Sequence, residues 1–139
     1  MPLPRRPGST PDPAVEAAWA SFLRLAAALD QGSRALLATI PSARRPGVPL
    51  AAGVAGFQAG LAAARGELPG WALAELAEAN TAAAEAIDAA GELAARLAAD
   101  ADGLDFEHRN ELVGDVLEEL VPVQDAERAV RALRRWGRR

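Results

Sequence analysis

The sequence predicts an all-α protein, and the simplest arrangement is an up-down-up-down four-helix bundle with one short helix and a bent C-terminal helix. Apolar residues recur at alternating steps of three and four, which is the spacing of one helical face. Ala, Leu and Glu, which are strong helix formers, dominate the longest uninterrupted stretch. No run alternates apolar and polar residues as a strand does.

The first helix is predicted over residues 13–40. Asp12 supplies an acceptor for the N-cap, and Pro13 has the fixed backbone angle that suits a first helical position. Gly32 and Ser33 can kink or interrupt this helix, because both residues have lower helix propensity than alanine.

The second helix is predicted over residues 49–65 and is shorter than the others. Ala52, Gly56, Gly60 and Ala64 are spaced by four, so they offer a smooth seam where another backbone can approach closely. We expect this seam to take part in helix packing or in self-association.

The same region carries no charge from Val48 to Ala64, so a membrane segment has to be considered. A span needs about 20 predominantly apolar residues, and this stretch is shorter and built from Ala and Gly. A buried core helix is the favoured interpretation, and no membrane partner is predicted.

The third helix is predicted over residues 69–101, with an apolar stripe that includes Asn80. We expect this amide to hydrogen-bond across the bundle or to lie at a solvent-exposed end of it. Replacing Asn80 with leucine would then raise the stability of the fold. Glu78, Glu85 and Glu92 are seven residues apart on the opposite face. That face is either a solvated outer surface or a docking surface for a basic partner.

The fourth helix is predicted over residues 105–136, with a bend near Pro122. Its last turn is basic, which suits the negative end of the helix dipole. These arginines either solvate the terminus and meet acidic residues, or bind bases and phosphates. The arginines are Arg131, Arg134, Arg135, Arg138 and Arg139. Across the bundle, the residues predicted to be buried are Trp19, Phe22, Phe57, Leu61, Leu73, Leu76, Ile87, Leu97, Phe106, Val113, Leu117 and Leu120.

Length and composition set the remaining bounds. A chain of 139 residues suits one domain, so we predict a disordered Pro-rich tail over 1–12 and a single helical-bundle domain over 13–139. A net charge of −4 argues against nucleic acid as a partner. Cysteine is absent, which excludes disulfides and thiolate metal sites. The N-terminus has no apolar segment typical of a secretory signal, so a cytoplasmic protein is expected.

Two acidic segments deserve comparison with a known family. Asp88 and Glu92, followed by Glu111 and Asp115, resemble the motifs of the all-α nucleotide pyrophosphohydrolases of the MazG type. That resemblance implies Mg²⁺ held by these carboxylates against a nucleoside triphosphate. The sequence departs from the family in both motifs: Ala89 stands where the middle Glu should be, and the second pair is four residues apart instead of three.

Other chemistry is sparse. His108 is the single histidine, and its place on the fourth helix predicts a surface position. No acid falls on an apolar stripe, so the sequence favours a non-enzymatic protein, and no catalytic, cofactor-binding or metal-binding residues are assigned. We therefore expect a helical interaction or accessory protein that self-associates through the seam of the second helix or through uncovered ends of the first and third. A Mg²⁺-dependent pyrophosphohydrolase is the alternative.

Overall fold

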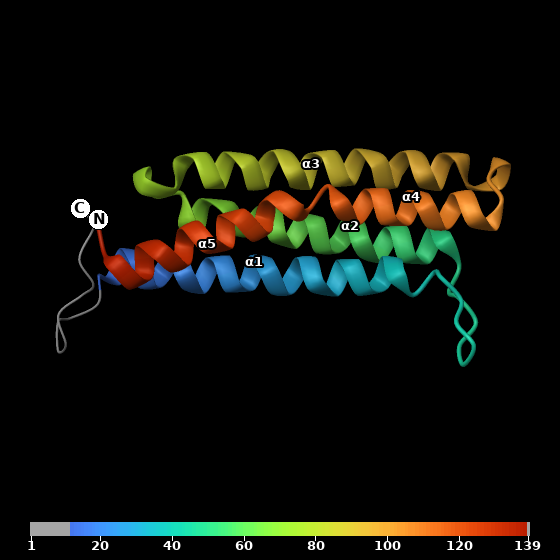
Figure 1. Cartoon of the computed structure of the whole chain (residues 1–139), viewed down its shortest axis with the longest axis horizontal. Helices are drawn as coiled ribbons and strands as arrows, with labels where there is room; N and C mark the ends of the chain where they lie inside the picture. The colour runs from blue at the N-terminus through green and yellow to red at the C-terminus, as the bar shows by residue number, and fades with distance from the viewer. Residues whose placement is uncertain (1–11, 139) are drawn as a thin grey trace.

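The computed structural model describes residues 12–138, and no strand occurs within that range. Figure 1 shows the helices side by side along one long axis, with successive legs running in opposite directions. The all-α fold and the up-down-up-down bundle are therefore confirmed. The elements are α1 (Pro13–Leu37), α2 (Leu50–Glu67), η1 (Leu68–Trp71), η2 (Ala74–Leu76), α3 (Ala77–Asp100), η3 (Ala101–Gly103), α4 (Phe106–Glu118) and α5 (Val121–Trp136).

The start of α1 follows the predicted capping pattern. Asp12 Oδ1 accepts a hydrogen bond of 2.9 Å from the backbone N–H of Ala14, and Pro13 occupies the first turn. The helix continues through Gly32 and Ser33 to Leu37, so these two residues do not interrupt it. Of the tail predicted over 1–12, all but Asp12 lies outside the described residues.

Gly32 is instead a packing position between α1 and α2. A Cβ built on Gly32 would lie 3.1 Å from the backbone oxygen of Phe57 and 3.3 Å from the Cα of Gly60. Such distances are possible only where two helix backbones nearly touch. The close approach explains why glycine is found there despite its cost to helix propensity.

The predicted third helix begins later than expected, because residues 68–76 form the two short 3-10 turns η1 and η2. Pro69 and Gly70 are poor helix formers, but the residues that follow are mostly good ones, so local propensity permits an α-helix from about Trp71 onward. The packing of Trp71 favours the two 3-10 turns instead. Its side chain is fully buried, and its ring packs edge to face against Phe22 with 5.2 Å between the ring centroids. The free energy gained by burying so large a ring exceeds the small preference of these residues for an α-helix.

The predicted core is largely confirmed. Phe22, Phe57, Leu61, Leu76, Ile87, Leu97 and Val113 are buried, and Trp19, Leu73, Leu117 and Leu120 are half-buried against them. Phe106 is the error, since 55% of it is exposed. It is the first residue of α4, and Figure 1 shows that end of α4 extending past the end of α1. Phe106 is on the predicted apolar stripe of the helix, but α1 does not extend far enough to cover this first turn.

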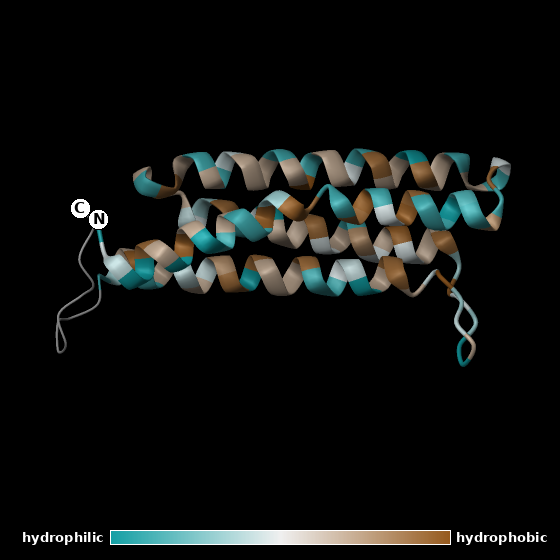
Figure 2. Cartoon of the chain, in the orientation of Figure 1, coloured by the Kyte–Doolittle hydropathy of each residue, from teal (hydrophilic) through white to brown (hydrophobic). Residues whose placement is uncertain are grey.

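The predicted bend near Pro122 is confirmed as a break. The α4 helix ends at Glu118, and α5 begins at Val121 with Pro122 in its first turn, where its missing N–H is tolerated. After the break, α5 packs against both α1 and α3. Figure 2 shows hydrophilic residues spaced along α1, α3, α4 and α5. Across 12–138, no helix is long and apolar enough to cross a membrane.

Candidate interaction surface

The outer face of α2 is the least polar helical surface of the bundle. Every exposed residue between Leu50 and Ala64 is an alanine. These residues are Ala51, Ala52, Ala55, Ala59, Ala62 and Ala63. We call this set the alanine face. The other long helices expose charged side chains along their outer surfaces, as amphipathic helices in water usually do.

The predicted seam on α2 is not this surface. Ala52 is exposed, Gly56 and Gly60 are half-buried, and Ala64 is fully buried. A step of four residues advances about 40° beyond one full turn, because an α-helix has about 3.6 residues per turn. A line of such steps therefore winds from solvent into the core. Both glycines face α1 within the same chain: a Cβ on Gly56 would lie 2.7 Å from the Cβ of Ala35.

Beside the alanine face runs an open groove between α2 and α3, with a volume of about 480 Å³. Gln58 lines this groove, and its Nε2 donates a hydrogen bond of 2.9 Å to the backbone oxygen of Gly91. At one side, Arg65 pairs with Asp88 across the two helices. Glu92 lines the groove and is exposed. The groove thus adds a few polar groups to an otherwise apolar surface.

Two larger apolar side chains lie where α1 leads into α2. Leu37 is 47% exposed at the end of α1, and Val48 is 42% exposed just before α2 begins. The backbone N–H of Val48 donates to the backbone oxygen of Ala38 at 2.9 Å, which holds the two ends of the loop together. Both are therefore exposed apolar groups close in sequence to the loop that precedes α2.

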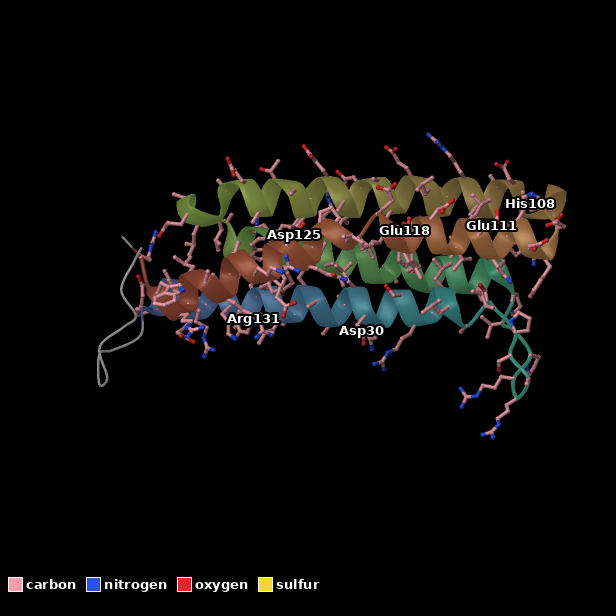
Figure 3. The ribbon with its side chains drawn as sticks, viewed as in Figure 1. Asp30, His108, Glu111, Glu118, Asp125 and Arg131 are labelled. Atoms are coloured by element: carbon pink, nitrogen blue, oxygen red, sulfur yellow. The ribbon has the colours of Figure 1, made fainter. Side chains whose placement is uncertain are left out.

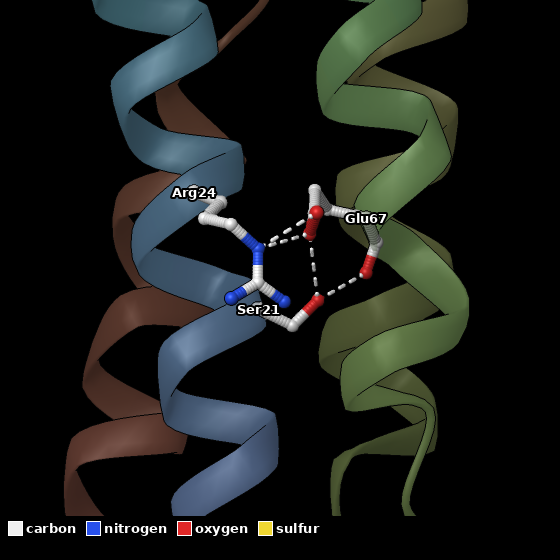
Figure 4. Close-up of polar contacts among 3 residues, drawn as sticks. All are labelled: Ser21, Arg24 and Glu67. Carbon is white, nitrogen blue, oxygen red and sulfur yellow. Dashed lines mark hydrogen bonds and ion pairs between the residues drawn. The ribbon is translucent and has the colours of Figure 1, made fainter.

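A polar cluster joins α1 to the end of α2, and Figure 4 shows its members Ser21, Arg24 and Glu67. Ser21 Oγ donates to the backbone oxygen of Glu67 at 2.7 Å, and Arg24 Nε donates to both carboxylate oxygens at 2.9 Å. Hydrogen bonding to Arg24 holds the pKa of the Glu67 carboxyl below its usual range. Because Ser21 is almost completely buried and already donates to a carbonyl, this cluster fastens helices together and is not suited to nucleophilic attack.

The four carboxylates of the pyrophosphohydrolase resemblance do not come together. Asp88 is paired with Arg65, Glu92 lines the groove between α2 and α3, and Glu111 and Asp115 are exposed on α4 beside two different hollows. Within residues 12–138, no group of three or more acidic or histidine side chains could hold a metal ion. The arrangement does not match the carboxylate set that the resemblance implies.

His108 lies on the surface, as predicted (Figure 3). Its ring nitrogen Nδ1 is 2.8 Å from Asp105 Oδ1, and its backbone N–H donates to the same oxygen. The Asp105 carboxylate raises the pKa of the His108 ring, and the backbone N–H of His108 lowers the pKa of Asp105. This pair caps the start of α4.

The basic end of α5 is engaged within the bundle. Arg134 bonds Glu16 of α1, with 3.2 Å between Nε and a carboxylate oxygen, and Arg138 bonds Glu75 of η2 at 2.6 Å. The guanidinium of Arg134 also lies 5.4 Å from the centre of the Trp19 ring, within cation–π range. Arg139 lies outside the described residues. These contacts support the expectation that the C-terminal arginines meet acidic residues of the bundle.

Comparison of the chain with protein-family models, with curated proteins and with solved structures finds no match. The function is therefore inferred from the surfaces described above. The sequence showed the absence of charge from Val48 to Ala64. It did not show that the alanines of this stretch face solvent while the glycines face α1.

Proposed function

We propose that this protein is a non-enzymatic helical interaction or accessory protein that self-associates through the alanine face of α2. The observation that carries the proposal is the absence of charge on that face. A helix face that stays in water normally carries charged or polar residues, and the exposed alanines leave none there. A second copy covering the face would remove its apolar surface from water.

Small side chains also favour this kind of contact. Packed helices lie about 8–10 Å apart, and the distance depends on the side chains between them. With alanine on both sides, two α2 helices can approach at the short end of that range. A two-fold pair is the expected arrangement, because closed two-fold dimers are the commonest homo-oligomers. Leu37 and Val48 would add larger apolar contacts at the ends of the interface.

Sedimentation equilibrium of the full chain at micromolar concentration tests the proposal. The wild type is expected to sediment as a dimer. Ala55→Arg combined with Ala59→Arg should yield a monomer, because arginines at the centre of the face would be buried without partners. Circular dichroism should show unchanged helix content, since both positions are exposed in a single copy.

The matched control places the same substitutions on the outer face of α1. Ala20→Arg combined with Ala27→Arg changes the net charge by the same amount at exposed alanines of that helix. This variant should remain a dimer. A wild type that stays monomeric, or a dimer that tolerates both arginines on α2, would show that the alanine face is not an interface.

A further inference from the structure

The loop between α1 and α2 is braced and projects from the end of the bundle (Figure 1). At its base, the Val48 N–H donates to the Ala38 oxygen at 2.9 Å. Nearer its tip, the Ser42 N–H donates to the Arg45 oxygen at 2.9 Å, and the Arg45 N–H donates to Ser42 Oγ at 3.2 Å. A loop held by its own hydrogen bonds loses less conformational freedom when it binds a partner.

Arg44 and Arg45 lie at the tip of this loop and are both exposed. Most other arginines within residues 12–138 contact a partner in the same chain. Arg109 donates to a backbone oxygen, and the guanidinium of Arg135 lies over the Trp136 ring. Ion pairs are formed by Arg24, Arg34, Arg65, Arg128, Arg131, Arg134 and Arg138. No ion pair or side-chain hydrogen bond engages either guanidinium of the loop within the same range. Two adjacent unpaired cations on a braced loop are available to an acidic partner.

The same chain presents an unpaired acidic surface. Glu78, Glu85 and Glu92 are exposed along α3, and within residues 12–138 no ion pair engages any of them. We call them the acidic row. Successive members lie roughly 10 Å apart, since each residue of a helix adds about 1.5 Å. In Figure 1, the loop leaves the bundle on the side of α1, and α3 forms the opposite side. The loop and the acidic row of one copy therefore do not meet.

We propose that the Arg44–Arg45 loop of one copy contacts the acidic row of a second copy. The proposal rests on the self-association described above, and it names the charged part of that contact. Charge complementarity favours a second copy as the partner, because both unpaired sets belong to this chain. Two copies with a net charge of −4 each repel one another overall, so their encounter requires a local attraction that orients them.

The strength of exposed ion pairs indicates what the alanine face and the charged surfaces each contribute to self-association. Such pairs are individually weak and are screened by salt. The alanine face therefore supplies the buried area, while the loop and the acidic row set orientation, association rate and salt dependence. Self-association should accordingly weaken as the salt concentration rises.

Charge reversal tests the contact by sedimentation equilibrium at about 20 mM and about 500 mM salt, on either side of the physiological range where exposed charges are already strongly screened. Arg44→Glu with Arg45→Glu should weaken the wild-type dimer at least about fivefold at low salt and have little effect at high salt. Glu85→Arg with Glu92→Arg should do the same. All four substitutions in one chain should restore the dimer, because the reversed loop then meets a reversed row.

The control is Arg34→Glu with Arg128→Glu, which changes the net charge as the loop variant does. Both arginines are exposed and pair only within their own helices. This variant should dimerise about as tightly as the wild type, although its added negative charge produces some general repulsion. A loop variant that weakens no more than this control would overturn the proposal.

A four-substitution chain that remains monomeric, with helix content intact, would overturn it too, since the loop would then meet some other surface. These outcomes differ from failure of the proposed function. If the alanine face is wrong, the wild type is monomeric or tolerates Ala55→Arg with Ala59→Arg. If only the charged contact is wrong, the wild type dimerises through α2 and the reversals behave like the control.

Discussion

Gly32 of α1 and Gly60 of α2 meet backbone to backbone. A Cβ built on Gly60 would lie 2.8 Å from the Cα of Gly32 and 2.7 Å from the backbone oxygen of Ala28. Neither neighbour is a flexible side chain that could move aside. The contact between the first two legs of the bundle therefore depends on glycine at both positions.

Gly60→Ala should lower the free energy of unfolding by about 1–3 kcal/mol, because the added methyl group forces the two backbones apart. Urea denaturation monitored by circular dichroism is the measurement. Gly114→Ala is the control, since a Cβ there meets nothing within 4 Å and the change should raise stability by about 1 kcal/mol. An equal gain at both positions would mean that α1 and α2 are not in close contact at Gly60.

Phe106→Ala should cost less than about 1 kcal/mol, because the ring is largely exposed and little apolar area returns to water when it is removed. Phe57→Ala is the matched comparison at a fully buried position, where a loss of about 3–5 kcal/mol is expected. Urea midpoints of the two variants give the answer directly. Similar losses for both phenylalanines would place Phe106 in the core after all.

The contrast between Phe57 and Phe106 shows how far the sequence alone could go. Periodicity assigns each residue to a face of its helix, and the faces of both phenylalanines were predicted correctly. Burial depends additionally on where the neighbouring helices end, which periodicity does not report. Trp71 shows the same limit: local propensity permits a helix from residue 71 onward, and the periodicity does not report that the indole ring packs against Phe22 in a segment of two 3-10 turns.

The candidate surface was partly predictable for similar reasons. The uncharged stretch from Val48 to Ala64 is visible in the sequence, but which of its small residues meet α1 depends on the packing of two helices. Arg44 and Arg45 also lie between the first two predicted helices, over residues 13–40 and 49–65. That both arginines are unpaired follows only from the positions of the acidic residues in three dimensions.

Asn80 has a more specific role than its stripe position suggested. Its Nδ2 donates a hydrogen bond of 2.9 Å to the backbone oxygen of Leu68, which is in η1. The prediction that leucine at this position raises stability is therefore replaced. Asn80→Leu should lower the free energy of unfolding by about 1 kcal/mol, because it removes the side-chain hydrogen bond that joins α3 to η1.

Asn110→Leu provides the comparison for this change in urea denaturation. Asn110 is half-buried on α4, and its side chain makes no hydrogen bond within residues 12–138. Its replacement should change stability by only a few tenths of a kcal/mol, as is usual for surface substitutions that break no specific contact. If Asn80→Leu is as mild as Asn110→Leu, the bond to Leu68 contributes little to the connection between α2 and α3.

The pair formed by His108 and Asp105 gives a prediction about pH. The pKa of His108 is raised, so its contribution to stability is fully present below the ordinary histidine value of about 6.5 and is lost as the pH rises through the raised pKa. The pKa of Asp105 is lowered, so its contribution is present above the ordinary value of about 3.9 and is lost as the pH falls through the lowered pKa. The pair therefore stabilises α4 between these two limits.

Asp105→Asn isolates the charge of this pair, because asparagine caps a helix about as well as aspartate. An NMR titration of the single histidine should give a pKa above about 6.5 in the wild type and a value near 6.5 in the variant. Glu111→Gln is the control: Glu111 acts on His108 through a longer-range charge interaction that is weaker than the Asp105 bond, so it should lower the pKa less. An unchanged pKa in Asp105→Asn would show that the ring does not bond the cap, and the stabilising window between the two limits would disappear with it.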